Sequence, residues 1–84
     1  MTRIWLEGRL IQVKCAANGL PDRFTWDGQT YRVAQITNEW EVNQLWWSGH
    51  IHRNYYKLTT QNGFLAIIYM DLLTDRWYLQ RLFN

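Results

Sequence analysis

Two histidines, His50 and His52, form the pair in this chain whose type and spacing suggest a metal site. Residues two apart on a strand project from the same face, so both imidazoles could reach one ion. A closed zinc site needs four protein ligands and a catalytic one needs three, and neither a Cys-x-x-Cys motif nor a Glu-rich segment lies nearby to supply the others. We therefore predict no metal and no cofactor.

The remaining reactive side chains stand alone. Cys15 has only a lysine neighbour, and Ser48 before Gly49 lacks the rest of a nucleophile elbow. The five glycines are scattered singly, so there is no glycine-rich phosphate loop. Asp71 and Asp75 flank a predicted turn, where Asp is common because it forms local hydrogen bonds. The chain is predicted not to be an enzyme, since no pair of groups is placed for acid–base or nucleophilic work.

The location of the protein is predicted from its single cysteine and its short apolar runs. One cysteine excludes an intramolecular disulfide, which fits a reducing compartment. Glu7, Gly8 and Arg9 interrupt any apolar run near Met1 that would resemble a signal peptide. The longest apolar stretch, residues 64–70, is too short to span a membrane. We expect a cytoplasmic protein that has no membrane partner.

Basic residues interleaved with aromatic ones indicate a binding surface more strongly than any of these groups indicates catalysis. Seven of the nine basic side chains are Arg, which suits planar contacts with phosphates and bases, although a net charge of +2 is too mild to indicate nucleic acid by itself. Stretches 46–57 and 76–81 combine both residue types, and aromatic faces stack bases at about 1–3 kcal/mol each. The candidate contacts for a nucleic acid or another partner are Arg23, Arg32, Trp46, Trp47, Arg53, Tyr55, Lys57 and Arg76.

Packing in the core is the alternative to a binding role for these aromatic residues. Adjacent residues on a strand alternate between faces, so one of Trp46 and Trp47 should be in the core, and likewise one of Tyr55 and Tyr56. A second Trp that caps one end of a barrel, and charges on a solvated surface, would also account for the pattern.

Hydrophobic patterning favours strands throughout, because apolar residues come in runs rich in Ile, Val, Thr, Tyr and Trp without a 3.6-residue spacing. The fourteen aromatic side chains can each bury roughly 150–250 Å², which suits a small core. Residues 1–84 are predicted to form one domain. We predict six strands, at about 2–14, 22–26, 30–38, 52–61, 64–71 and 76–83, with the third continuing bent or bulged through residue 42.

Asp27-Gly28 predicts a tight hairpin between the second and third strands, because a type I′ turn needs positive φ at both central residues. The turn fixes three facing pairs: Trp26–Gln29, Phe24–Tyr31 and Arg23–Arg32. Two arginines directly opposite one another are destabilising unless an acid or a phosphate lies between them. The nearby acids are Asp22, Glu39 and Glu41.

Asn62-Gly63 predicts a second hairpin of the same kind. Its register gives three facing pairs that should point to the core: Thr60–Leu65, Leu58–Ile67 and Tyr56–Tyr69. The residues expected on the opposite side are Arg53, Tyr55, Lys57, Ile68 and Met70.

Six short strands would leave exposed edges unless the sheet closes. We therefore predict an all-β domain, a small six-stranded antiparallel barrel of the SH3-like type. An OB-like barrel is the alternative, although it usually includes a helix that is absent from this pattern.

Two segments resemble known bacterial sequences. The first is Trp46-Trp47-x-Gly49-x-x-x-Arg53-x-Tyr55-Tyr56 with Asn62-Gly63, Trp77-x-Leu79 and Leu82-Phe83; it resembles the C-terminal segment of a mutagenesis protein that is a catalytically inactive relative of Y-family DNA polymerases. The second is Phe24-x-Trp26-x-Gly28-x-x-Tyr31-x-Val33, which looks like the front half of a small stand-alone family of unknown function that carries both segments. This resemblance implies an accessory role in DNA damage tolerance, near either DNA or a repair protein.

Two hypotheses of function follow. The first is a domain that binds single-stranded or duplex DNA through the arginine and aromatic residues. The second is a protein-interaction module whose partner is a repair or polymerase protein, or another copy of itself, with the chain existing as a monomer or weak homodimer. Salt-dependent binding of DNA would distinguish the first from the second.

Overall fold

The computed structural model describes the backbone of residues 2–47 and 49–83, and within these ranges every side chain except those of Thr2, Arg3, Trp5, Leu6, Glu7 and Trp46. Six strands account for most of this length: β1 (Thr2–Cys15), β2 (Pro21–Trp26), β3 (Gln29–Trp46), β4 (Gly49–Thr60), β5 (Leu65–Asp71) and β6 (Arg76–Phe83). No helix in the described ranges is long and apolar enough to cross a membrane. The predicted all-β architecture is confirmed, with β3 and β4 longer than expected.

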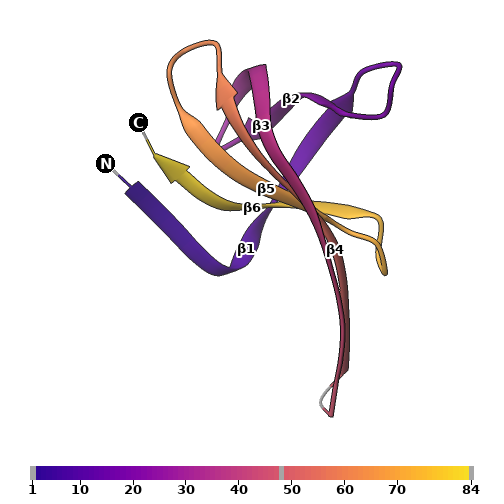
Figure 1. The fold of residues 1–84 in the computed structure, drawn as a ribbon. Coiled ribbons are helices and arrows are strands. Elements are labelled where there is room, and N and C mark those ends of the chain that lie inside the picture. The colour runs from indigo at the N-terminus through magenta and orange to yellow at the C-terminus, as the bar shows by residue number, and fades with distance from the viewer. Residues whose placement is uncertain (1, 48, 84) are drawn as a thin grey trace.

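The strands form a closed antiparallel ring in sequence order, in which β6 pairs back onto β1 (Figure 1). Every strand thus neighbours the strands before and after it in the chain. This up-and-down order differs from the Greek-key order of an OB-fold. β1 and β3 each bend so that they pair with different neighbours along their length, because β1 has an irregularity between Ile4 and Arg9, and β3 has two register shifts between Val33 and Asn38.

The core lies inside the ring and follows the two-residue alternation of the strands. Its fully buried side chains include Leu58, Ile68 and Leu79, each 0% exposed, from three consecutive strands. On β2 and β3, Phe24 and Tyr31 complete the core with stacked rings whose centroids are 5.0 Å apart. Tyr56 is buried in this cluster, as predicted.

The first hairpin matches its predicted geometry. Asp27 and Gly28 both have positive φ, 51° and 77°, which is the requirement of a type I′ turn. Its pairs are Trp26–Gln29, Phe24–Tyr31 and Arg23–Arg32, so the predicted register is confirmed.

The predicted register of the second hairpin is wrong by one residue. Tyr56 faces Ile68 rather than Tyr69, and Tyr69 instead faces Tyr55. The cause is a longer loop: of Asn62 and Gly63, only Gly63 has positive φ (90°), so a two-residue type I′ turn cannot form. Thr60 closes the loop, since its amide donates to the Phe64 carbonyl at 2.8 Å and its hydroxyl accepts from the Phe64 amide at 3.0 Å.

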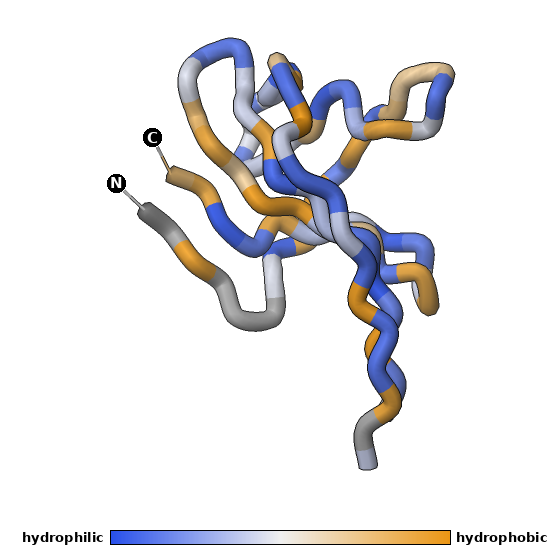
Figure 2. Tube along the Cα trace, in the orientation of Figure 1, coloured by the Kyte–Doolittle hydropathy of each residue, from blue (hydrophilic) through white to orange (hydrophobic). Residues whose placement is uncertain are grey.

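A third hairpin, absent from the sequence prediction, joins β3 to β4 and projects away from the ring (Figure 1). We call residues 43–52 the arm. The β4 side of the arm pairs only with β3, because pairing with β5 begins at Arg53. Figure 2 shows isolated hydrophobic residues among hydrophilic ones along the arm. Trp47, near its tip, is 96% exposed and is therefore not the core Trp of the predicted pair; the side chain of Trp46 lies outside the described residues.

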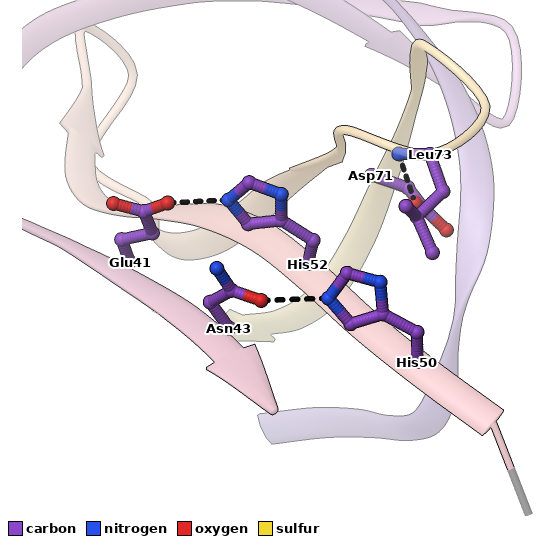
Figure 3. Close-up of polar contacts among 6 residues, drawn as sticks. All are labelled: Glu41, Asn43, His50, His52, Asp71 and Leu73. Atoms are coloured by element: carbon purple, nitrogen blue, oxygen red, sulfur yellow. Dashed lines mark hydrogen bonds and ion pairs between the residues drawn. The ribbon is translucent and has the colours of Figure 1, made fainter. Parts of the chain in front are cut away.

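One face of the arm carries a line of polar contacts between its two strands (Figure 3). Nε2 of His50 lies 2.7 Å from the Asn43 side-chain oxygen, and His52 pairs with the carboxylate of Glu41. The two imidazole rings stack with centroids 5.9 Å apart. Each histidine is therefore engaged with a residue of β3, and no cluster of three metal-ligating side chains occurs among the described residues.

Candidate anion-binding face

A row of three basic residues crosses the outer surface of β1, β2 and β3. Lys14 of β1 faces Arg23 of β2, and Arg23 faces Arg32 of β3. Residues directly opposite in neighbouring antiparallel strands point to the same face. The neighbours Phe24 and Tyr31 point into the core, so the three basic side chains point outward. We call these residues the basic row.

Neutral hydrogen-bonding groups form a second row beside the first. Gln12 faces Thr25, and Thr25 faces Thr30, whose hydroxyl oxygen lies 3.5 Å from that of Thr25. A groove of about 390 Å³ is lined by Gln12, Val13, Lys14, Arg23, Thr25 and Thr30. Arg32 borders a second groove, with Thr30, Gln61 and Asn62. The first groove therefore offers two cations and several neutral donors on one open surface.

Among the described side chains, no acid forms an ion pair with the basic row. The ion pair that the described residues contain joins His52 to Glu41 at the base of the arm, far along β3 from the row. The acids that the sequence placed near Arg23 and Arg32 are thus not bound to them. Two like-charged contacts across strands cost a few tenths of a kcal/mol each. An anion on this surface would convert that repulsion into attraction.

Arg76 lines an adjoining groove of about 340 Å³ that shares Gln12 and Val13 with the first. It faces Asp71 across β5 and β6, and Asp75 lines the same groove. Arg76 is exposed and lies on the far side of β1 from Arg23. Arg76 therefore borders the candidate face, but unlike the basic row it lies beside two acids, Asp71 and Asp75.

Arg53 belongs to a different structure, a ladder of aromatic rings on the outer side of β3–β6. Trp40, Tyr55, Tyr69 and Tyr78 come from four neighbouring strands, and their successive ring centroids are 5.2, 5.0 and 5.2 Å apart. We call these four residues the aromatic ladder. The guanidinium carbon of Arg53 lies 4.5 Å from the Tyr69 ring centroid, and Arg53 donates to the Tyr55 hydroxyl at 3.1 Å. Arg53 thus covers the ladder.

Burial and the contacts between Arg53 and the ladder shift the pKa values of Arg53 and Tyr69. Burial alone lowers the pKa of Arg53, but the hydrogen bond to Tyr55 and the nearby Asp71 outweigh it, so the pKa of Arg53 is raised overall. Burial raises the pKa of Tyr69, which the charge of Arg53 lowers only in part. At neutral pH, Arg53 is therefore charged and Tyr69 is neutral in the folded protein.

The predicted contacts consequently fall into separate groups. Arg23 and Arg32 lie together, whereas Arg53 and Tyr55 lie in the aromatic ladder. Tyr55 is 8% exposed, so it presents no free ring face for stacking a base. Lys57 is half-buried opposite Asn38 and Ile67. Trp47 is 96% exposed near the arm tip, away from buried Tyr55.

Sequence reasoning missed Lys14 and Gln12 as members of this face. Their place depends on how β1 pairs with β2 across the loop at residues 16–20. That loop is held by the Ala16 amide donating to the Leu20 carbonyl at 2.8 Å and the Leu20 amide donating to the Asn18 side-chain oxygen at 3.0 Å. Asn18-Gly19 marks a turn in the sequence, but this five-residue loop has no simple register rule.

Comparison with known proteins gives a family without an assigned role. No curated protein and no solved structure matches the chain significantly. The resemblance to the polymerase relative therefore stays a prediction. A family model described as a domain of unknown function (DUF6504) matches residues 8–84, almost the whole length, and the chain belongs to this family.

Proposed function

We propose that this chain is a non-catalytic domain that binds the phosphate backbone of a nucleic acid on the outer face of β1, β2 and β3. The observation that carries the proposal is the basic row, in which Lys14 faces Arg23 and Arg23 faces Arg32, and no acid among the described side chains forms an ion pair with them. Phosphate contacts from Lys and Arg supply most of the affinity in sequence-independent nucleic-acid binding.

The dimensions of the row support a polyanion rather than a single ion. Neighbouring strands lie about 4.8 Å apart, so three adjacent strands place the basic residues along roughly 10 Å. Duplex DNA carries one charge per about 1.7 Å of its axis, so a row of this length can meet several phosphates. The hydroxyls of Thr25 and Thr30 and the amide of Gln12 add the neutral donors that commonly contact phosphate and sugar oxygens.

The surface favours backbone contacts over base stacking. The residues that line the groove include no aromatic side chain, and the rings predicted for stacking are either buried in the aromatic ladder or placed on the arm. We therefore propose binding with little sequence preference. A setting in DNA damage tolerance is proposed only on the resemblance of the segment from Trp46 to Tyr56.

Titration of labelled single-stranded and duplex DNA at low and at moderate salt tests the proposal. Three phosphate contacts predict that log K falls with log salt with a slope of about −2 for single strands and about −3 for duplex. Replacing both arginines in Arg23→Gln/Arg32→Gln should remove most of the binding. Absence of binding by the unmodified protein at low salt would contradict the proposal.

A further inference from the structure

The β3 strand has a long free edge. Its pairing with β2 ends at Arg32, and from Val33 onward it pairs only with β4. In the order of strands around the ring, β3 neighbours β2 and β4 alone. The backbone N–H and C=O groups on the other side of residues 33–46 therefore meet no strand within the described part of the chain. Unpaired edges of this kind are templates for another strand.

Residues 39–46 of this edge form a regular stretch. Both register shifts of β3 lie before Asn38, so residues 39–46 run without a bulge. Natural edges are commonly blunted by Lys, Pro or bulges, and residues 33–46 contain neither Lys nor Pro. Leu45, near the arm tip, is 85% exposed. A two-stranded ribbon is only marginally stable alone in water, so the arm gains from further strands.

We infer that the occupant of this edge is a second copy of the same chain, paired antiparallel along β3 about a two-fold axis. The two β3–β4 ribbons then form one four-stranded sheet. An interface in which the same patch serves both subunits is the commonest way for soluble proteins to dimerise. This inference does not depend on the proposed nucleic-acid binding, because the basic row lies at the other end of β3.

The charge pattern of the edge makes it complementary to itself. Both acids of the free edge, Glu39 and Glu41, lie at the end of the 39–46 stretch that is farther from the tip, and residues 42–46 carry no charge. Antiparallel pairing therefore separates the acids of the two copies, whereas parallel in-register pairing would set like charges side by side, which is unfavourable.

The acids also limit the register. A two-fold axis at Glu39, Trp40 or Glu41 would place two glutamates directly opposite each other. Within the regular stretch 39–46, axes at Val42 and Asn43 avoid this and keep the longest overlap. With the axis at Val42, Leu45 of one copy faces Glu39 of the other. With the axis at Asn43, Leu45 faces Glu41 of the other copy. Either register places Leu45 opposite a glutamate.

This prediction gives a matched pair of variants, Leu45→Lys and Leu45→Glu. The side chain of Leu45 is almost fully exposed, so neither change disturbs the folded monomer. Lys at this position would face a glutamate twice in each dimer, whereas Glu would create two repulsive pairs. The dimer dissociation constants of the two variants should differ at least about tenfold, with the Lys variant binding more tightly.

Sedimentation equilibrium over a wide range of concentrations measures these constants, and hydrogen exchange reports the edge directly. The unmodified protein should dimerise, and the amides of residues 39–46 should gain protection as its concentration rises. A protein that stays monomeric at every concentration would overturn the inference and leave the arm free for a different protein. Equal weakening by both variants would also overturn it, because an apolar anchor loses affinity with either charge.

Discussion

Arg53 lies over the ring of Tyr69, with its guanidinium carbon 4.5 Å from the ring centroid. Tyr69 is 1% exposed although it points away from the core of the ring of strands. Its burial comes from its neighbours on the outer surface: Arg53, the rings of Tyr55 and Tyr78, and Gly8 of β1. The aromatic ladder is thus a second, smaller core at the base of the arm.

Replacing Arg53 by Gln should destabilise the protein by about 1–3 kcal/mol, because both the cation–π contact and the hydrogen bond to Tyr55 are lost. Arg53→Lys keeps the charge but not the planar guanidinium, so it should recover only part of the loss. Urea unfolding monitored by Trp fluorescence gives the free energies. Equal stability of the Gln variant and the unmodified protein would show that the ladder does not need its cover.

Gly8→Ala should be strongly destabilising, because a Cβ there would lie 2.9 Å from Cβ of Tyr78 and 3.0 Å from the Tyr69 hydroxyl. Gly19 is a matched control, since it has a similar φ of +84° but nothing within 4 Å of its Cβ position. Both variants suffer the left-handed backbone strain of about 1–2 kcal/mol. Only Gly8→Ala should add roughly 1–3 kcal/mol of overpacking, measured by thermal or urea unfolding. Similar losses for the two would contradict the close packing of β1 on the aromatic ladder.

Alkaline pH should destabilise the fold. Burial raises the pKa of Tyr56 and of Tyr69 above the ordinary value of 10.0. Above about pH 10 the unfolded chain loses these protons while the folded chain keeps them, so the stability they confer is complete below that pH and falls as pH rises through the folded pKa values. Tyr69→Phe should flatten this decline. Urea unfolding at a series of alkaline pH values would show it, and an unchanged pH profile in the Phe variant would exclude Tyr69 as a cause.

The two hairpins show how far local sequence determines register. Asp27-Gly28 supplies both positive φ angles that a tight turn requires, so every facing pair of that hairpin follows from the sequence. At Asn62-Gly63 only the glycine adopts positive φ, and the buried Thr60 side chain closes a longer loop. Whether this hairpin forms a two-residue turn or a longer loop depends on packing around Thr60, which the Asn-Gly motif does not specify.

The sequence predicted neither the arm nor the place of Lys14 in the basic row. Apolar residues around Trp46 and Trp47 suggest core, yet the chain reverses there and carries Trp47 into solvent. Arg23 and Arg32 could be paired from the sequence because one tight turn joins them. Lys14 joins them only through the pairing of β1 with β2, and this pairing depends on an irregular loop.

Arg23→Gln should raise stability slightly, by about 0.2–1 kcal/mol, because Arg23 faces Lys14 on one side and Arg32 on the other. Arg76→Gln removes the same charge from a residue that faces Asp71, so it should have the opposite sign. Unfolding at low salt measures both, and high salt should shrink both effects by screening. A loss of stability in Arg23→Gln would mean that the basic row is not under repulsion.

The central claim is that the basic row, rather than positive charge in general, binds nucleic acid. Lys14→Gln and Lys57→Gln change the net charge equally, but only Lys14 belongs to the row. The decisive measurement is the salt dependence of DNA binding for both variants. Lys14→Gln should weaken binding and reduce the magnitude of the slope of log K against log salt by about 0.7–0.9, while Lys57→Gln should leave both unchanged. Equal losses in the two variants, or a loss only in Lys57→Gln, would contradict the assignment of this face.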